Sequence, residues 1–441
     1  VAGRSEFSLR FFSTAWGLVA VALTYRLGRR LLLNRWVAAA AALLAAVSAY
    51  LVWYAQEGKM YSLVVLLALA STECYVSALR GGGRARWLAY VLVTTAAFYV
   101  HLVAALLVAA HALAFAIVPR AVRGARWRGW LASMAALTLP YVPLLAWQVP
   151  MLRAQAETGY SAVAPGDMIH SLLTSYSLGV MPPASPWWLV PFVAAFLAPL
   201  LWRGESDAPR FSRGLLATWA ILPVLIFGLV NLMRPMYTAR YLIFVLPAFF
   251  LLIAAGIGTL ARRSRPLAAA LLVVVIALNV RGLWVQARTP LKSDLRGATR
   301  YVTERLQPGE LVLFQIPYGR YSFEYYAEIE RPHPAAAISE DGAGSSAPGG
   351  PVWRALIPVA VRHVPLVWAE GLYTNAGMTP EEVDRLMAGQ VAGHQAVWLV
   401  ASEVELWDER GLVEAWLAEH GELTDRRDLV RVSVYRYALG E

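Results

Sequence analysis

The sequence predicts a polytopic α-helical membrane protein with a soluble α/β domain at its C-terminus. Its 441 residues are 58% hydrophobic and only 15% charged, and the mean hydropathy is +0.50. A soluble domain is usually about a quarter charged. Long apolar stretches recur over residues 1–285, whereas residues 286–441 have dispersed charges and only short apolar runs. We therefore expect lipid to solvate the first part of the chain and water the second.

About ten apolar stretches are candidates for helices that cross about 30 Å of hydrocarbon. They are Ser8–Leu27, Val37–Tyr54, Met60–Leu79, Trp87–Val100, Leu102–Val118, Trp130–Val149, Trp187–Trp202, Leu215–Met233, Tyr241–Leu260 and Pro266–Trp284. The fourth and fifth are taken as two crossings joined by a tight turn, because one long helix would hold His101 at mid-membrane.

The loops between these stretches alternate in charge. One set is rich in arginine, and the positive-inside rule places it in the cytoplasm. Its residues are Arg26, Arg29, Arg30, Arg35, Arg80, Arg84, Arg86, Arg120, Arg123, Arg126, Arg128, Arg203, Arg210, Arg213, Arg262, Arg263 and Arg265. The other set is poor in positive charge and is expected to face outward. If the tenth helix runs outward, residues 286–441 are extracytoplasmic, and we expect a multi-pass protein of an inner (cytoplasmic) membrane.

Composition also excludes several functions. The formal net charge of +10 could indicate nucleic acid, but the arginines lie between apolar runs and not in one basic domain, so no nucleic-acid partner is expected. The single cysteine, Cys74, excludes an intrachain disulfide and any cysteine-based metal site. Asp167 and His170 lie in a predicted outer loop, but two isolated ligands do not support a divalent metal.

The last third of the chain predicts a small α/β domain. Leu311–Ile316 and Val397–Ala401 are short apolar runs typical of strands, and Leu295–Leu306 and Glu381–Met387 have helical patterns. Asp294 directly precedes the first of these helices, where an aspartate side chain commonly caps the helix N-terminus.

The most informative short segment is Gln56-Glu57-Gly58-Lys59-Met60-Tyr61, which joins two predicted helices through a very short outer loop. It places an amide, an acid, a base and a tyrosine at the membrane boundary, where water is scarce and charge interactions are stronger. Such a set is suited to binding a phosphorylated group at the level of the lipid headgroups. The alternative is an ordinary loop in which Glu57 and Lys59 are solvated and Trp53, Tyr54 and Tyr61 form an aromatic belt.

Three stretches follow one another in a recognisable order. They are Gly3-Arg4-Ser5-Glu6-Phe7-Ser8-Leu9-Arg10, Tyr54-Ala55-Gln56-Glu57-Gly58-Lys59-Met60-Tyr61 and Tyr99-Val100-His101. Together they resemble the family 39 glycosyltransferases, which are bacterial relatives of the protein O-mannosyltransferases and of the aminoarabinose transferase that modifies lipid A. Arg240, Tyr241 and Pro247 extend the resemblance towards the C-terminus. It implies a GT-C membrane fold and a polyprenyl-phosphate-linked sugar as donor. It also implies an acceptor lipid, glycan or protein on the outer side, and inversion at the anomeric carbon.

The resemblance also implies which residues form the site. Glu57 and His101 are the expected catalytic residues, and the donor-binding residues are Gln56, Lys59, Tyr61, Tyr237 and Arg240. Lys59 stands where the family commonly has arginine, which keeps the charge but loses the bidentate grip on phosphate. Arg240 could stabilise the departing lipid phosphate, or it could extend to anionic headgroups. His101 could instead be a structural hydrogen-bonding residue.

The resemblance also predicts an acidic residue in a first outer loop ahead of Gly3. Family members use it as the general base that accepts the proton of the attacking hydroxyl. We therefore expect this chain to be truncated at its N-terminus, to lack that aspartate, and to be inactive unless Glu57 or Glu6 substitutes for it.

Two other functions compete with glycosyl transfer. A transporter or flippase for lipid-linked sugars or small molecules would have a similar apolar chain. However, only Glu73 and His111 lie well inside the predicted spans, with no evident partner, and coupled transporters usually need paired or relayed groups. A non-catalytic membrane assembly subunit, whose outer domain binds a partner, is the third possibility.

Overall fold

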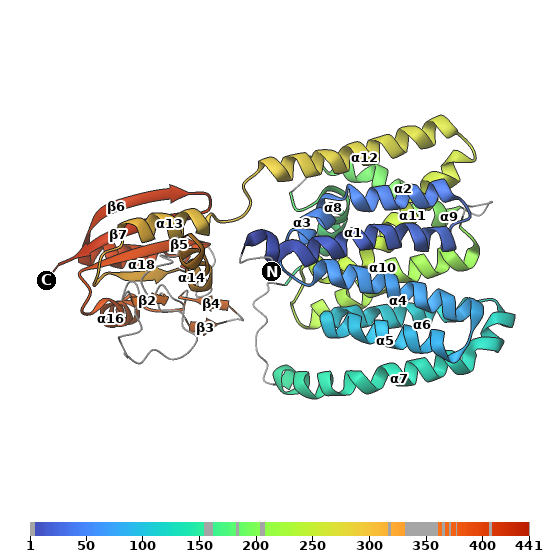
Figure 1. Ribbon diagram of the computed structural model, residues 1–441, viewed down its shortest axis with the longest axis horizontal. Coiled ribbons are helices and arrows are strands. Elements are labelled where there is room, and N and C mark those ends of the chain that lie inside the picture. The colour runs from blue at the N-terminus through green and yellow to red at the C-terminus, as the bar shows by residue number, and fades with distance from the viewer. Residues whose placement is uncertain are drawn as a thin grey trace, which may run out of the picture. The chain divides into compact units, whose positions relative to one another are not determined.

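The computed structural model describes residues 5–153, 162–181, 185–202, 208–315, 319–330, 360–363, 367–369, 372–375, 377–404 and 408–440. The chain divides into two compact units, Val1–Thr289 and Pro290–Glu441. The first is a bundle of helices, and the second is built around a β-sheet (Figure 1). The sequence analysis placed this boundary between residues 285 and 286.

The helices of the first unit coincide with all ten predicted stretches. They are α1 (Glu6–Leu31), α2 (Arg35–Ala46), α3 (Ala49–Ala55), α4 (Tyr61–Gly81), α5 (Arg84–Val100), η1 (Leu102–Ala105), α6 (Leu106–Ala116), α7 (Arg120–Arg153), α8 (Pro165–Leu178), η2 (Pro186–Leu189), α9 (Val190–Leu201), α10 (Arg210–Met233), η3 (Ala239–Val245), α11 (Leu246–Ala261) and α12 (Arg265–Arg288). Helix α8 was not predicted, because it lies in a stretch that was interpreted as a loop.

Six helices among the described residues are long and apolar enough to cross a membrane, and a seventh span is possible if α2 and α3, bent by 56°, form one. At the remaining predicted positions the helices are shorter: α5 has 17 residues, and Leu102–Ala116 and Pro186–Leu201 are short apolar helices. The chain is therefore a multi-pass membrane protein, as predicted, although not every predicted span has the length of a full crossing.

The segment η3–α11 forms the centre of the bundle, and its apolar stretch is completely buried. Side chains from other helices hydrogen-bond to carbonyls of η3. The Tyr176 hydroxyl of α8 donates to Leu242 O at 2.5 Å, and the Trp219 indole of α10 donates to Phe244 O at 3.0 Å. These bonds matter because a buried carbonyl without a partner is costly. They fix the backbone just after Arg240.

The arginine-rich turns are tied together at one end of the bundle. Arg80 donates to Arg30 O at 2.6 Å, which joins the C-terminal ends of α4 and α1. Arg126 at the start of α7 donates to Leu79 O at 3.2 Å. In Figure 1 the α1–α2, α6–α7 and α11–α12 turns lie at this same end. The alternation of charge in the sequence therefore corresponds to two different ends of the structure.

The expectation that Glu73 and His111 lack partners is wrong. Glu73 Oε1 lies 3.0 Å from Arg26 Nε and 2.9 Å from Arg30 Nε, both on α1. His111 is fully buried, and its ring nitrogens lie 3.2 Å from the Thr72 and Tyr90 hydroxyls. These pairs join helices that are distant in sequence, so periodicity along one helix could not indicate them.

The second unit contains a five-stranded sheet of order β2-β1-β5-β7-β6 and a separate β3–β4 pair. Its elements are α13 (Leu295–Arg305), β1 (Leu311–Phe314), α14 (Gly319–Glu330), β2 (Ala360–His363), β3 (Val367–Ala369), β4 (Leu372–Thr374), α16 (Pro380–Val391), β5 (Ala396–Ser402), α18 (Leu412–His420), β6 (Gly421–Leu429) and β7 (Val432–Leu439). Strand β1 pairs in parallel with β2 and β5, whereas β7 is antiparallel to both of its neighbours, β5 and β6.

Helices cover both faces of this sheet. Leu311 and Leu313 of β1 pack in one cluster with residues of α16 and α18, while Val312 and Phe314 pack in another with residues of α13 and α14. This alternation follows from the two-residue period of a strand. Asp294 Oδ1 accepts the Gly297 N–H at 2.8 Å, so the predicted cap of α13 is confirmed. The unit is an α/β domain, as the sequence predicted.

Candidate functional site

The turn that carries Glu57 is fastened to α1 on both sides. The Thr14 hydroxyl donates to Ala55 O at 3.0 Å, where α3 ends, and the Ser13 hydroxyl donates to Lys59 O at 3.1 Å, just before α4 begins. Helix α3 ends at Ala55, and the Gln56 N–H still bonds back to Trp53 O at 3.1 Å. The backbone between Ala55 and Lys59 is therefore held at two points, which orients the side chains it carries.

Glu57 and Lys59 form a loose ion pair in this turn. Lys59 Nζ lies 3.7 Å from Glu57 Oε2. The Lys59 side chain is 54% exposed, and the Glu57 side chain is 14% exposed. The exposed ammonium limits the strength of the pair, because water screens it. The carboxylate, in contrast, is largely removed from solvent. Glu57 therefore does not fit the alternative of an ordinary loop in which both charged groups are solvated.

A chain of aromatic rings links this turn to two other turns at the same end of the bundle. Tyr54 and Tyr61 lie 4.8 Å apart between ring centroids, Tyr61 and His101 6.0 Å, and His101 and Tyr241 5.5 Å. Tyr61 is only 3% exposed, so it packs inside the protein and does not form part of a lipid-facing aromatic belt. We call these four residues the aromatic cluster. The structure thus brings together segments that are far apart in the sequence.

His101 is the buried polar member of the aromatic cluster. It ends α5 with an extended backbone, and its N–H donates to Ala97 O at 2.9 Å. The side chain is 7% exposed, and within the described part of the chain its Nδ1 atom is buried without a hydrogen-bond partner. A buried ring nitrogen that lacks a partner carries an energetic cost, which a hydrogen-bonding ligand would relieve.

Arg240 stands beside the same cluster. Its guanidinium carbon lies 5.9 Å from the centroid of the Tyr241 ring. Arg240 therefore adjoins the aromatic cluster through Tyr241. Arg240 is half-buried, and it lies at the start of the buried η3–α11 segment. This placement differs from that of an arginine extended along a lipid-facing helix.

Tyr237 and Gln56 lie on different sides of this arrangement. The Tyr237 hydroxyl donates to Met168 O at 3.1 Å and so fastens α8 to the turn before η3. Gln56 lines a cavity of about 260 Å³ between α1, α2, α3 and α4, whose walls are mostly small apolar residues together with Thr14 and Ser62. Of the predicted site residues, the structure therefore groups Glu57, Lys59, Tyr61, His101 and Arg240, with Tyr237 and Gln56 at the edges.

Sequence reasoning missed three residues that shape the site. Tyr54 and Tyr241 belong to the quoted motifs but received no role, although they connect the charged residues. Asn231 is 3% exposed and accepts the Met236 N–H at 3.0 Å, which holds the turn before Tyr237. An asparagine at the end of an apolar helix was the available signal. Asp167 and His170 are exposed on α8, and among the described residues no three metal-ligating side chains gather.

Comparison with protein families shows which proteins share these motifs. Residues 1–147 match the family described as dolichyl-phosphate-mannose-protein mannosyltransferase. This region contains all three stretches that carried the resemblance, which is thereby confirmed. No curated protein matches the sequence of this chain.

Solved structures show the same fold. The crystal structure of ArnT from Cupriavidus metallidurans in the apo state matches 97% of this chain and 83% of its own, with a TM-score of 0.54 at 13% identity. The structure of the same protein bound to undecaprenyl phosphate matches 98% of this chain and 84% of its own, with a TM-score of 0.53 at 14% identity. The chain therefore has the GT-C membrane fold predicted from its motifs.

Proposed function

We propose that this multi-pass protein of the GT-C fold is a glycosyltransferase. It would move a sugar from a polyprenyl-phosphate donor to an acceptor on the outer side of its membrane, with inversion at the anomeric carbon. The observation that carries the proposal is the grouping of Glu57, Lys59, His101 and Arg240 around the aromatic cluster. These residues come from three turns at one end of the bundle, opposite the arginine-rich end. Two cations are suited to stabilising a departing phosphate, an acid to acting on the attacking hydroxyl, and a buried imidazole to hydrogen-bonding the donor.

The chemistry follows from the charge that develops in the reaction. As the bond between the anomeric carbon and the phosphate oxygen breaks, negative charge collects on the lipid phosphate. The Arg240 guanidinium and the Lys59 ammonium would stabilise it. Glu57 would orient the attacking hydroxyl or accept its proton, and His101 would bind a sugar hydroxyl or a phosphate oxygen through Nδ1. The aromatic rings would exclude water from the reacting atoms.

The cavity of about 260 Å³ that Gln56 lines is suited to the hydrocarbon part of the donor. Its walls are mostly small apolar residues, and it lies one residue from Glu57. A prenyl chain in this cavity would bring its phosphate to the level of Glu57 and Lys59. ArnT binds undecaprenyl phosphate, and a polyprenyl-phosphate donor for this protein is proposed by analogy.

The proposed orientation follows from the positive-inside rule. The end of the bundle that carries Arg30, Arg80 and Arg126 would be cytoplasmic, and the aromatic cluster would face the periplasm or outer surface. Residues 286–441 would then form an extracytoplasmic domain on the same side as the site, after a transmembrane region of residues 1–285. An inner-membrane location in a bacterium belongs to the same proposal.

The test uses the purified protein in proteoliposomes with radiolabelled polyprenyl-phosphate sugars and a membrane extract as the source of acceptor. Release of free polyprenyl phosphate is measured, because every acceptor gives that product. Glu57→Gln should lower turnover by about 100-fold, typical of a lost acid–base group, with an unchanged amount of folded protein. Glu304→Gln, on an exposed side chain of the second unit, is the matched control.

The competing functions give different results in the same assay. A flippase would move the labelled donor across the bilayer without breaking the sugar–phosphate bond. A non-catalytic subunit would do neither. Movement of intact donor that is insensitive to Glu57→Gln would reject the proposed reaction.

A further inference from the structure

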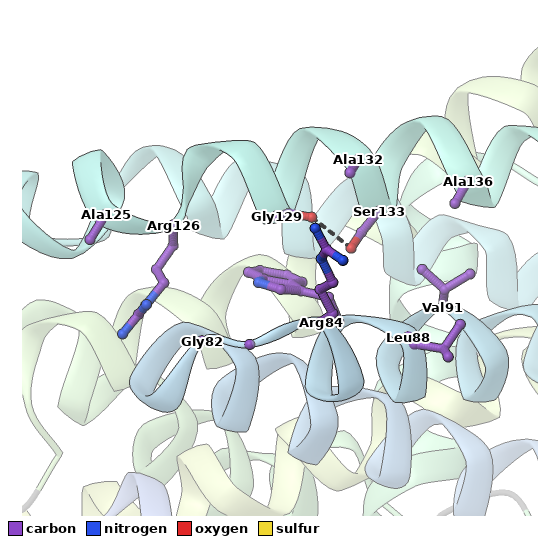
Figure 2. A pocket seen from close by; sticks show the side chains of 12 residues that line it. Gly82, Arg84, Leu88, Val91, Ala125, Arg126, Gly129, Ala132, Ser133 and Ala136 are labelled. Atoms are coloured by element: carbon purple, nitrogen blue, oxygen red, sulfur yellow. Dashed lines mark hydrogen bonds between the residues drawn. The ribbon is translucent and has the colours of Figure 1, made fainter.

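A second cavity lies at the opposite, arginine-rich end of the bundle, between α5 and α7. Its volume is about 420 Å³. Figure 2 shows that Leu88 and Val91 of α5 lie across from the small residues Ala132 and Ala136 of α7. Only 11% of the apolar stretch of α7 is buried, so the cavity is a groove beside a helix that is mainly exposed to lipid. We call it the α5–α7 groove.

The shape of the groove depends on a glycine. A Cβ atom at Gly129 would lie 2.2 Å from Trp87 Nε1, so the indole of Trp87 rests directly against the backbone of α7. Trp87 is 7% exposed and lines the groove, so its ring forms part of the wall.

Arg84 supplies the charge at this groove. Its side chain extends from α5 towards α7 beside Gly129 and Ser133 (Figure 2). It forms no ion pair or hydrogen bond with any side chain that the structure describes. Arg126, in contrast, is fixed by its bonds to Leu79 O at 3.2 Å and Arg80 O at 3.4 Å. Among the residues that the structure describes, the lining of the groove contains arginine and no carboxylate.

A neighbouring cavity lies on the other side of Arg126. Its volume is about 520 Å³, it shares Ala125 and Arg126 with the α5–α7 groove, and its walls include Val122 and Phe211. Its described lining contains Arg80 and no carboxylate. The two apolar cavities therefore meet at Arg126, at the arginine-rich end of the bundle.

We propose that these two cavities bind the two acyl chains of one anionic phospholipid from the adjacent leaflet, and that Arg84 binds its phosphate. Each acyl chain would occupy an apolar cavity, and the net positive, carboxylate-free lining would favour a headgroup with net negative charge. In the α5–α7 groove, the distance along α5 from Arg84 to Val91 is about 10 Å, enough for the first half of an acyl chain below its headgroup. In the proposed orientation this is the cytoplasmic leaflet. The inference does not depend on glycosyl transfer.

The test is a titration of the purified full chain in detergent with dioleoylphosphatidylglycerol or dioleoylphosphatidylcholine, followed by native mass spectrometry. The wild type should bind one phosphatidylglycerol at least tenfold more tightly than it binds phosphatidylcholine. Arg84→Gln should weaken the binding of phosphatidylglycerol about tenfold, as expected for one lost charge-assisted contact, whereas Arg84→Lys should retain part of the preference.

Two further variants separate a built site from general attraction to charge. Ala132→Phe fills the α5–α7 groove without removing a charge, and it should weaken binding to a similar degree. Arg265→Gln removes an exposed arginine at the start of α12, far from both cavities in sequence, and should leave binding unchanged. Equal affinities for the two lipids, or equal losses in Arg84→Gln and Arg265→Gln, would overturn the proposal.

Discussion

The imidazole of His101 lies 5.5 Å from the ring of Tyr241, so the turn that ends α5 meets the first turn of η3. The ring of Tyr61 lies 6.0 Å from the same imidazole. Two tyrosine rings therefore pack against His101, and its buried Nδ1 lacks a partner among the residues the structure describes. Packing of this kind holds a side chain in one orientation before a ligand arrives.

The first prediction separates the shape of His101 from its nitrogens. His101→Phe keeps an aromatic ring in contact with Tyr61 and Tyr241, so the variant should fold and accumulate like the wild type. It removes both hydrogen-bonding atoms, and kcat/KM for release of polyprenyl phosphate should fall by about 10- to 100-fold, corresponding to one hydrogen bond to a charged or developing group. Steady-state kinetics on purified protein, normalised to the monodisperse fraction, would measure this.

His111→Phe provides the contrast. His111 is hydrogen-bonded to Thr72 and Tyr90 in the core of the bundle. Its replacement should therefore lower the thermal stability and the yield of the protein, and it should affect the activity per folded molecule less. Normal activity in His101→Phe would assign His101 a purely structural role.

The second prediction concerns Arg240. Arg240→Ala should raise the dissociation constant for polyprenyl phosphate by about 10- to 100-fold, because a phosphate loses a charge-assisted partner in a partly buried site. Arg240→Lys should recover part of the affinity, since the charge returns without the bidentate geometry. Lys59→Ala should have a smaller effect, because the Lys59 side chain is 54% exposed. Binding can be measured by microscale thermophoresis, and equal losses in the Ala and Lys variants of Arg240 would exclude a role for its charge.

The sequence was sufficient for those features that depend on local pattern. Long apolar runs predicted the helices of the first unit because a membrane span must be both apolar and long. Strand β1 is buried between helices on both faces of the sheet, and its residues Leu311–Phe314 point alternately into two apolar clusters. A strand buried on both faces is a continuous apolar run in the sequence, so it could be predicted. Strand β6, in contrast, was not predicted. Its sequence Gly421–Leu429 is rich in charge, which suits an exposed edge strand but conceals it from a hydropathy pattern.

The site was predictable only in part, for a related reason. Glu57 and Lys59 are neighbours in sequence, so their pairing could be expected from the loop alone. The approach of His101 to Tyr241, and that of Glu73 to Arg26 and Arg30, depends on how helices pack. Such contacts follow from tertiary structure, and no periodicity within one helix contains them.

The third prediction tests the proposed orientation with single cysteines in a Cys74→Ala background. Gly166, Gly389 and Gly124 are suitable sites, because a Cβ atom at each meets no atom within 4 Å. Cysteine at Gly166, on α8, or at Gly389, in the second unit, should react with an impermeant maleimide in intact cells. Cysteine at Gly124, near the start of α7, should react only after the membrane is permeabilised. The opposite pattern would invert the topology and place the aromatic cluster in the cytoplasm.

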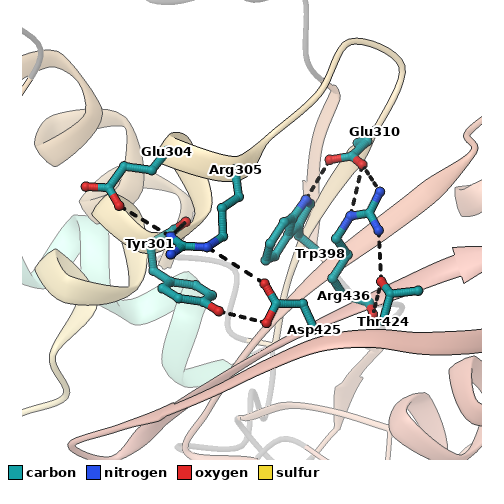
Figure 3. Close-up of polar contacts among 8 residues, drawn as sticks. All are labelled: Tyr301, Glu304, Arg305, Glu310, Trp398, Thr424, Asp425 and Arg436. Carbon is teal, nitrogen blue, oxygen red and sulfur yellow. Dashed lines mark hydrogen bonds and ion pairs between the residues drawn. The ribbon is translucent and has the colours of Figure 1, made fainter.

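The second unit contains a buried ion pair that should determine its stability. Glu310 precedes β1, has a side chain that is only 3% exposed, and pairs with Arg436 of β7 through both Nε, at 3.0 Å, and Nη2. Its other oxygen accepts the Trp398 indole N–H of β5 at 2.7 Å (Figure 3). Nearby, Tyr301 donates to Asp425 at 2.7 Å, and this hydrogen bond raises the pKa of Tyr301.

The last prediction follows from this arrangement. Glu310→Ala leaves the Trp398 N–H and the Arg436 guanidinium without their acceptor, and should destabilise the second unit by about 3 kcal/mol, the usual cost of breaking a buried pair from one side. Glu310→Gln should cost less, because its amide oxygen still accepts one of these bonds. The double variant Glu310→Leu with Arg436→Met should regain much of the loss, since apolar replacement of both partners removes the uncompensated charge. Hydrogen exchange at the amides of β5 in the full chain reports the stability of this unit. Glu304→Gln, whose side chain is 59% exposed, should leave exchange unchanged. Additive losses in the double variant would show that Glu310 and Arg436 act independently.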